Sequence, residues 1–542
     1  MQEGQSRRWP GWVLLLSAIV ALSTALPHAW QALTCPPDEV FTGFVEAQND
    51  QNLYMVWLQQ AREGRVLMDN LATPEQAPPI FVGPHWVALG MLARVIPIPL
   101  IVLYRIVAVA LAFAYLLILW RLVSELFARE HARLFAFVIG ALGSGFGVIC
   151  DAINTAAGRV VIVSADLMPE LWAYHSFLLP HFTLALCSMA LLTLTLLRAW
   201  RAPSLRLGVA AAGWAFLLTA VHPYDLAVWG PLLMLHLAAG LATGVPWRTL
   251  SVNLWALGGA FVPTAVYALL ARSHPMLAVW AEQNVLRSPA PLVYLIGTGA
   301  ILPLAIFGFR SLREEGDAPD QRRLQSVFLG LWPAVTALIA YSYPLVPFER
   351  RAVEGVHIPL GLLAATTIAV RIVPWLRQRL AEPDAPARRV ALILLLFAIL
   401  PTNLALLVYG ARTEEARLPL GMVRGFEWIA ANTPPDARIF AGMYVGQHLM
   451  RYAMRHVFAG QLQTTINPDA RRALAWEFFA EGTDNARRRE ILRESGCGWV
   501  AADREQARAL EGLTWLEEAH DAGELRIFRF PGAGPPPVLG AD

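Results

Sequence analysis

Two adjoining stretches decide the fold of this chain: the apolar WVLLLSAIVALSTALPHAWQAL (residues 12–33) and the polar TCPPDEVFTGFVEAQND (residues 34–50). A helix of about 20 apolar residues crosses a hydrocarbon core of about 30 Å, so the first stretch is long enough to span a membrane. Arg7 and Arg8 precede it, and it lacks a small-residue cleavage site. We therefore expect an uncleaved membrane helix rather than a signal peptide.

The rest of the chain repeats the apolar pattern. Hydrophobic residues make up 56% of the 542 residues, charged residues make up 15%, and the mean hydropathy is +0.46. A soluble protein could not bury so much apolar surface, so we predict an α-helical polytopic membrane protein with about eleven transmembrane helices. The net charge of +2 argues against nucleic acid as a partner, which leaves the lipid bilayer. The expected helices lie near residues 12–33, 98–120, 134–149, 177–197, 207–221, 226–241, 250–270, 292–309, 327–341, 358–372 and 390–407.

Arginines indicate the side of the membrane on which each loop lies. They are dense in the loops on the side of the N-terminus, such as residues 198–206 and 371–389, and sparser in the opposite loops. Arginine excess marks the cytoplasmic side, so the N-terminus is predicted inside and the first loop, residues 34–97, outside. An odd number of helices places the C-terminus outside as well. We expect a multi-pass protein of the cell inner (plasma) membrane.

The last part of the chain, residues 412–542, is much more charged than the transmembrane domain expected at residues 1–411. We predict a small extracytoplasmic α/β domain there. It has no phosphate-binding glycine loop and no metal-ligand spacing, which favours a docking or acceptor-recognition domain over an independent enzyme. The helix-like runs are 424–431, 469–479 and 487–495, and the strand-like runs are 438–441, 498–501 and 525–530.

Ionisable residues gather in further loops on the predicted outer side. Such groups are costly at the edge of a bilayer unless they are paired or hydrated, so they often line a cavity. The alternative is structural: histidines can bond to the backbone, His222-Pro223 can end a helix, and arginines can anchor the interface. Arg350 and Arg351 depart from the positive-inside trend, which favours a ligand role. The residues are Asp166, Glu170, His175, His181, His222, Tyr224, Asp225, Arg350, Arg351, Glu354 and His357.

Asp50 is the most informative residue of the first outer loop. It either caps an amphipathic helix from about residue 51 to 62 or provides the acidic group of a site. Asp38 and Glu39 compete for the acidic role, although the prolines before them favour a turn. Tyr54, with nearby tryptophans, fits an interfacial aromatic belt or a platform on which a sugar stacks.

The layout resembles the glycosyltransferase class C superfamily, membrane enzymes that use polyprenyl-phosphate-linked donors and include protein O-mannosyltransferases and aminoarabinose transferases. The matching features are a first span, a long outer loop with an acidic residue, many further spans and an outer C-terminal domain. Many members carry paired acidic residues in this loop, whereas Asp50 lies between Asn49 and Gln51, and the pair Asp38-Glu39 lies earlier. Four stretches are similar to bacterial proteins of this type: NDQNLYMVWLQQAREGRVLMDN (49–70), PHF (180–182), HPYD (222–225) and RRAVEGVHIPL (350–360).

The resemblance implies a hexosyl- or pentosyltransferase. It would move a sugar from polyprenyl phosphate to an acceptor hydroxyl on the outer face, and direct displacement would invert the anomeric centre. The acceptor can be a glycan, a lipid or a protein. A carboxylate must take the proton of the acceptor hydroxyl, and we assign this step to Asp50, assisted by Asp166 or Glu170.

Positive charge must meet the departing phosphate. Arginine forks match phosphate oxygens, so Arg350 and Arg351, supported by His222, are the expected donor-phosphate ligands. No residue is assigned to a dedicated metal site. A Mg²⁺ or Mn²⁺ ion that bridges Asp50, Asp166 and the phosphate suits oxygen ligands, but the sequence does not require one. The expected substrate contacts are Tyr54, His175, His181, Tyr224, Asp225, Glu354 and His357.

Two other classes of function remain open. One is a transporter or flippase of a lipid-linked or small anionic substrate. Transporters place polar groups near the midplane on broken helices, often in repeated halves, whereas here the polar groups lie at loop ends. The other is a non-catalytic assembly protein for an envelope polysaccharide.

Overall fold

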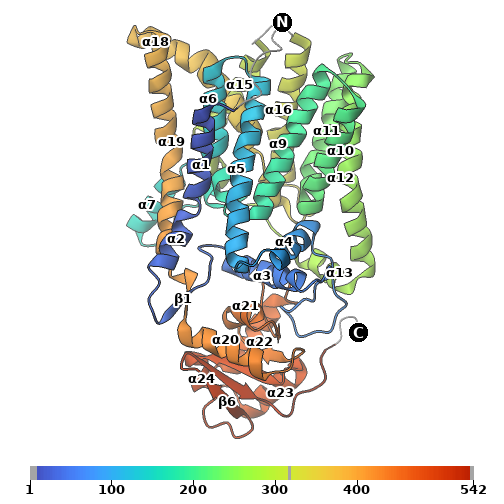
Figure 1. The fold of residues 1–542 in the computed structure, drawn as a ribbon, viewed down its shortest axis with the longest axis vertical. Coiled ribbons are helices and arrows are strands. Elements are labelled where there is room, and N and C mark those ends of the chain that lie inside the picture. The colour runs from blue at the N-terminus through green and yellow to red at the C-terminus, as the bar shows by residue number, and fades with distance from the viewer. Residues whose placement is uncertain (1–8, 315–318, 538–542) are drawn as a thin grey trace. The chain divides into compact units, whose positions relative to one another are not determined.

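The structure is a computed structural model that describes residues 9–314 and 319–537. Arg7 and Arg8, on which part of the predicted orientation depends, lie outside these residues. The chain forms two compact units, each assembled from three stretches. The first unit comprises residues 1–26, 105–266 and 285–409, and the second comprises residues 27–104, 267–284 and 410–542. Figure 1 draws the chain coloured by residue number.

The first unit consists of helices. An α-helix pairs the main-chain polar groups of its interior with one another, which is what a hydrocarbon environment requires. The helices found wholly or partly in this unit are α1 (Gly11–Ser23), α5 (Leu100–Leu126), α6 (Glu130–Leu142), α7 (Gly147–Ala157), α8 (Ala173–Ser176), α9 (Pro180–Arg201), α10 (Leu205–Val221), α11 (Leu226–Ala242), α12 (Trp247–Ser273), α14 (Pro291–Thr298), α15 (Ile301–Glu314), α16 (Pro319–Ile339), α17 (His357–Thr367), α18 (Val373–Leu380) and α19 (Asp384–Arg412). Short turns of helix are η1 (Ala165–Leu167), η2 (Pro223–Asp225), η3 (Glu349–Val353) and η4 (Ile368–Ile372).

Seven helices of the described residues are long and apolar enough to cross a membrane, and nine if the bent pairs α1–α2 and α14–α15 each count as one span. The predicted fold class, a polytopic helical membrane protein, is confirmed. The count of about eleven is not. Two of the expected spans account for the difference: α10 has only 17 residues, and α16 carries Arg322 and Arg323 near its start.

Small residues let the helices of the first unit approach closely. A Cβ on Gly308 of α15 would lie 1.9 Å from the Leu363 carbonyl oxygen of α17, and one on Gly259 of α12 would lie 2.1 Å from that of Ala212 on α10. Membrane helices associate largely through such close packing, because lipid provides no hydrophobic driving force between them. These two glycines therefore fix helix contacts.

One span of the first unit is broken. The pair α14 and α15 bends by 77°, at Gly299, whose φ of +52° suits glycine far better than other residues. The predicted helix at residues 292–309 is therefore two helices, a difference that the apolar pattern alone could not reveal.

The second unit joins the first loop to the C-terminal part of the chain. It contains α2 (Leu26–Leu33), α3 (Gln48–Arg62), α4 (Pro84–Val95) and α13 (Pro275–Gln283). Strand β1 (Glu39–Phe41) pairs antiparallel with β2 (Arg417–Pro419), with Val40 opposite Leu418. The loop and the C-terminal part therefore fold together, although the paired residues Glu39 and Pro419 are 380 positions apart in the sequence.

A five-stranded sheet forms the rest of the second unit (orange to red in Figure 1), with strand order β4-β3-β5-β7-β6. Strand β3 is parallel to β4 and β5, whereas β7 is antiparallel to β5 and β6. The α/β character predicted for the C-terminal part is confirmed. The strands are β3 (Arg438–Phe440), β4 (His456–Val457), β5 (Trp499–Asp503), β6 (Glu517–Asp521) and β7 (Leu525–Arg529), and the helices are α20 (Leu420–Asn432), α21 (Met443–Tyr452), α22 (Pro468–Phe479), α23 (Asn485–Ser495) and α24 (Arg504–Arg508).

A partly buried arginine ties α3 to α21 within this unit. Arg451 donates to the Asn52 side-chain oxygen at 3.0 Å and to the Thr42 carbonyl oxygen at 2.7 Å, and its guanidinium lies 4.7 Å from the Phe44 ring centroid. The Asn52 amide lies 3.1 Å from His448 Nδ1. Burial, together with the charge of Arg451, lowers the pKa of His448 to about 3, so its imidazole is neutral and can accept that hydrogen bond.

Candidate active site

The turn His222-Pro223-Tyr224-Asp225 joins α10 to α11. Proline has no N–H and clashes with the preceding turn of a helix, so α10 ends just before His222. The short turn η2 then leads directly into α11, which brings His222 and Asp225 to the same helix ends.

Glu354 reaches this turn from a distant part of the sequence. Its Oε2 lies 2.9 Å from His222 Nδ1, and Asp225 Oδ2 lies 3.2 Å from the same nitrogen. All three side chains are buried. Five of their atoms make no correctly oriented hydrogen bond with any described residue. They are both nitrogens of His222, both carboxylate oxygens of Glu354 and Oδ2 of Asp225. The cluster is therefore a set of buried ligand atoms within 4.8 Å of one another.

Arg351 adjoins the cluster from η3. Its guanidinium lies 4.9 Å from the centroid of the Tyr224 ring, and its charge stabilises the Asp225 carboxylate. Glu349 fixes this turn, because its carboxylate accepts from the Ser288 N–H at 3.1 Å and from the Tyr343 N–H at 2.8 Å.

Arg350 forms a second ion pair beside the first cluster. Its Nη2 donates to Glu170 Oε1 at 3.2 Å, and Glu170 itself is buried. The charge of Glu170 reaches Glu354, so the two groups of side chains adjoin. The residues that the structure brings together are Glu170, His222, Tyr224, Asp225, Arg350, Arg351 and Glu354.

Asp166 has its hydrogen bonds satisfied elsewhere in the first unit. Its Oδ2 accepts from the Gly145 N–H at 2.9 Å and the Gly147 N–H at 3.0 Å, and its Oδ1 accepts from the Ser164 hydroxyl. Gly147 has no room for a side chain, because a Cβ there would lie 2.6 Å from Asp166 Oδ1. The carboxylate thus holds the turn between α6 and α7 against η1.

The other three histidines predicted as site residues are all buried in the first unit. His357 Nε2 lies 3.0 Å from the Tyr115 hydroxyl, a contact within the helical core. The His181 ring packs 4.5 Å from that of Phe182, which in turn lies 5.5 Å from the His222 ring. Phe182 thus contacts both His181 and His222, and His175 lies on α8.

Asp50 belongs to the second unit and lies in the first turn of α3. This helix begins at Gln48 after Ala47, whose φ is +46°, so it starts about three residues earlier than predicted and Asp50 is not its N-cap. A carboxylate in the first turn is favoured by the helix dipole. Asp50 Oδ1 accepts from Gln461 Nε2 at 2.8 Å, which orients the carboxylate.

Tyr54, Asp38 and Glu39 also lie in the second unit. The Tyr54 ring stacks on Trp86 with centroids 4.5 Å apart, which makes it part of an aromatic cluster between α3 and α4. Glu39 pairs with Arg417 at 3.6 Å across the β1–β2 ladder, and the Asp38 carbonyl accepts from the Leu420 N–H. Glu39 therefore belongs to the β1–β2 pairing, and Asp38 lies directly before it.

The cluster of His222, Asp225 and Glu354 fits a divalent cation by its chemistry. One imidazole and two carboxylates are common ligands of Zn²⁺ and Mn²⁺, and both His222 nitrogens, both Glu354 oxygens and Asp225 Oδ2 have no hydrogen-bond partner outside the cluster among the described residues. Sequence reasoning named all three residues but assigned none to a metal. Only the His-x-x-Asp spacing of residues 222–225 was visible, since Glu354 follows 129 residues later (354 − 225).

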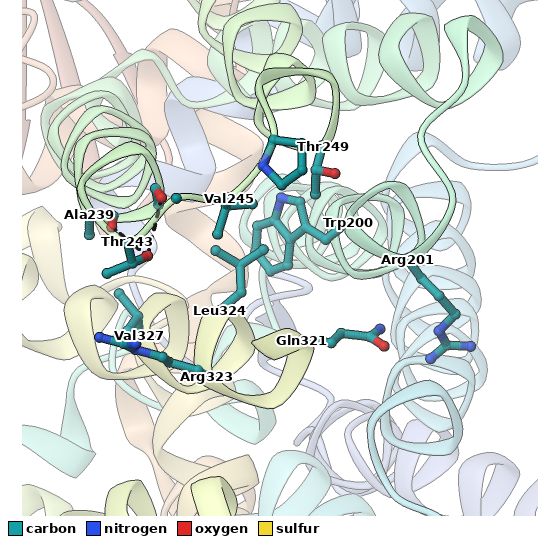
Figure 2. A pocket seen from close by; sticks show the side chains of 13 residues that line it. Trp200, Arg201, Ala239, Thr243, Val245, Thr249, Gln321, Arg323, Leu324 and Val327 are labelled. Atoms are coloured by element: carbon teal, nitrogen blue, oxygen red, sulfur yellow. Dashed lines mark hydrogen bonds between the residues drawn. The ribbon is translucent and has the colours of Figure 1, made fainter. Parts of the chain in front are cut away.

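A cavity lies at the ends of α9 and α11 that are opposite to the His222 turn (Figure 2). Its volume is about 510 Å³, and Arg201 of α9, Thr243 after α11 and Arg323 of α16 line it. No carboxylate or imidazole is among the described residues that line it. The imidazole and carboxylates of the His222 cluster therefore lie at the other end of α11, not at this one.

No family model and no curated protein matches this sequence. Solved structures match most of the chain at low identity, which establishes the fold alone. The oligosaccharyltransferase AglB of Archaeoglobus fulgidus, in complex with an inhibitory peptide and a dolichol-phosphate, is 14% identical, with a TM-score of 0.57 over 92% of this chain and 70% of that one. ArnT of Cupriavidus metallidurans, bound to undecaprenyl phosphate, is 13% identical, with a TM-score of 0.51 over 97% and 99%.

A third match is the arabinofuranosyltransferase AftD from Mycobacteria. It is 16% identical, with a TM-score of 0.51, and covers 99% of this chain but 42% of the AftD chain. All three are glycosyltransferases of the class C fold. The fold that the sequence resemblance predicted is therefore confirmed.

Proposed function

We propose that this protein is a membrane glycosyltransferase that moves a hexosyl or pentosyl group from polyprenyl phosphate to an acceptor hydroxyl. The observation that carries the proposal is the buried cluster of His222, Asp225 and Glu354, with Arg351 beside it at the ends of membrane helices. The fold supports it, because AglB and ArnT, which share the fold, are known with dolichol-phosphate and undecaprenyl phosphate bound.

Arg350 and Arg351 receive the donor phosphate in this proposal. A guanidinium offers paired N–H donors that match two phosphate oxygens. Glu170 holds Arg350, and Tyr224 lies under Arg351, so both forks are positioned before the donor arrives. His222 supports them, and His175, His181 and His357 shape the buried surroundings.

Asp50 takes the acceptor proton. The acceptor oxygen forms a bond to the anomeric carbon while the bond from that carbon to the phosphate oxygen breaks, and the electron pair stays on the phosphate. The proton moves to the Asp50 carboxylate, and the anomeric centre is inverted. Gln461 orients this carboxylate, Glu170 assists the reaction, and Asp166 contributes by holding the α6–α7 turn.

A divalent cation held by His222, Asp225 and Glu354 is the second part of the proposal. Such an ion would add positive charge where the phosphate departs. AglB has been solved in complex with Zn and sulfate, which shows metal binding by that protein. In this chain the argument rests on the three buried ligands.

The proposed arrangement in the cell follows from the arginine distribution. Residues 1–411 form the membrane domain of an inner-membrane protein, and residues 412–542 lie on the outer side with the first loop. The donor and the acceptor glycan, lipid or protein would then be bound on that side, with Tyr54 as a sugar contact in the second unit.

Binding of undecaprenyl phosphate tests the proposal directly. The full chain in nanodiscs is titrated with undecaprenyl phosphate, and binding is followed by native mass spectrometry. We expect Arg351→Gln to weaken binding about tenfold or more, because charge-assisted hydrogen bonds to phosphate are lost. Arg323→Gln, an exposed arginine at the opposite helix ends, is the matched control and should bind like the unaltered protein.

Two results would contradict the proposal. One is no binding of undecaprenyl phosphate by the unaltered protein. The other is equal loss in Arg351→Gln and Arg323→Gln, since that would mean a general charge effect rather than a site.

A flippase of a lipid-linked substrate is the second candidate, favoured by the break between α14 and α15. Transporters often build their sites at broken helices. Sealed vesicles distinguish the two candidates: a flippase moves a fluorescent polyprenyl phosphate sugar across the bilayer, whereas a transferase transfers the sugar without moving the lipid across.

A further inference from the structure

A cavity of about 630 Å³ lies at one edge of the five-stranded sheet, entirely within the second unit. Residues just after β3, residues of α22 and residues from the end of β5 through α24 line it. Strands β3 and β5 are adjacent and parallel, so their carboxyl ends meet at the same edge. In open α/β sheets this edge is where ligands bind.

Two aromatic side chains of this cavity are exposed to an unusual degree. Trp476 on α22 is 76% exposed and Tyr444 on α21 is 51% exposed. Large aromatic residues are normally buried in a soluble domain, so two of them lining one cavity indicate a binding surface. A flat aromatic ring offers a face on which the C–H groups of a sugar ring can pack.

The rim of the cavity is polar and mainly acidic. Asp503, Glu505 and Glu481 contribute carboxylates, and Gln506 contributes an amide. Asp503 is held in place, because it accepts from the N–H groups of Glu505 at 3.1 Å and Gln506 at 2.9 Å as the cap of α24. Fixed acceptors of this kind suit ligands that present many hydroxyl donors.

The charge of the cavity excludes phosphate-bearing ligands. The arginine among its lining residues, Arg472, is paired with Asp469 at 2.8 Å. Three carboxylates around it would repel a nucleotide, a lipid phosphate or an acidic glycan. An uncharged ligand with both an apolar face and hydroxyl groups fits the lining best.

We propose that this cavity binds a neutral saccharide unit of the glycan acceptor, with Trp476 and Tyr444 against the sugar ring and the carboxylates of Asp503, Glu505 and Glu481 at its hydroxyls. The inference that a saccharide binds here depends only on the lining of the cavity. The further inference that this saccharide is the acceptor rests on the proposed transferase function. The C-terminal sheet would then select the acceptor, while the lipid donor is bound in the first unit.

Saccharide binding is tested with the full chain in nanodiscs prepared without sugar-based detergents. The probes are neutral gluco-, manno-, galacto- and arabino-oligosaccharides, and saturation-transfer NMR reports which ring protons contact the protein. We expect one of these series to bind. Trp476→Ala should weaken its binding about tenfold or more, because the contact between the indole ring and the sugar is lost. Trp476→Phe keeps a flat ring and should retain most of the binding.

Trp428→Ala is the matched control, because Trp428 lies in the same unit but packs on His520 rather than lining the cavity. It should bind saccharide like the unaltered protein. The proposal is overturned if no oligosaccharide binds, if Trp476→Ala binds unchanged, or if a basic peptide binds the cavity instead. Undecaprenyl phosphate binding is measured on the same samples: its absence with saccharide binding intact would sink only the transferase function.

Discussion

The buried carboxylates beside His222 need positive charge close by. Two buried carboxylates, Asp225 and Glu354, face one imidazole, and leaving buried charge unpaired costs several kcal/mol. Arg351 offsets part of this charge. A divalent cation, an imidazolium or a proton on one of the carboxyls offsets the rest, and metal content distinguishes the first state from the other two.

Metal content tests the cation. We expect about one equivalent of Mn²⁺ or Zn²⁺ per chain after equilibration and removal of free metal, as measured by inductively coupled plasma mass spectrometry. His222→Ala and Glu354→Gln should lose it, because each removes a ligand. His236→Ala, which changes a buried histidine bonded to Asn253, is the control and should retain it. A metal-free protein under these conditions would exclude the cation.

Asp50→Asn tests the catalytic base. Asparagine keeps an oxygen that can accept from Gln461, so we expect normal folding, but it cannot take a proton. Transfer from a polyprenyl phosphate sugar to an acceptor should fall about 10²- to 10⁴-fold. The assay follows a labelled sugar, and thermal unfolding of the same sample checks the fold.

Glu39→Gln and Asp38→Asn are the controls for that experiment. Glu39 is engaged with Arg417, so its loss should affect stability more than chemistry. If transfer survives Asp50→Asn but is lost in either control, the acidic pair is the base. If transfer survives in all three variants, an enzyme with a base in this loop is excluded.

At the scale of helices and strands, apolar periodicity predicted the elements whose formation depends on local sequence. Every expected span falls on helical residues, but the spans expected at 12–33 and 292–309 are bent pairs of helices and the one at 134–149 covers parts of α6 and α7. A bend such as that at Gly299 depends on one backbone conformation rather than on composition. In the sheet, β3, β5 and β7 were predicted from their apolar residues. Strand β6 (EEAHD) was missed, since it is a polar edge strand without alternation, and β4 has only two residues.

The candidate site was predictable only residue by residue. His222, Asp225 and Arg351 attracted notice because they are ionisable residues next to apolar spans. That Glu354 meets His222, that Gln461 meets Asp50 and that Asp166 is occupied by two glycine N–H groups are tertiary contacts. Contacts of this kind carry no local signal.

At the scale of the whole molecule, the orientation in the membrane is a prediction that single cysteines can test. Cys35 is the partly exposed cysteine and the other three are buried, so Cys35→Ser gives a silent background. Glu494→Cys on α23 and Arg379→Cys on α18 then place one exposed thiol in each region. A membrane-impermeant maleimide should label the first in intact spheroplasts and the second only after lysis, because arginine-rich loops stay in the cytoplasm. Labelling in the reverse order would contradict the assigned sides.

The contact between Asn52 and Arg451 has a consequence for biosynthesis. The two residues are 399 positions apart, so at about 5–20 residues per second the ribosome completes the second roughly 20–80 s after the first. Throughout that interval the first loop lacks the strand β2 and the guanidinium that fix it. The nascent loop therefore has only its own contacts, such as those between α3 and α4, until translation is nearly finished.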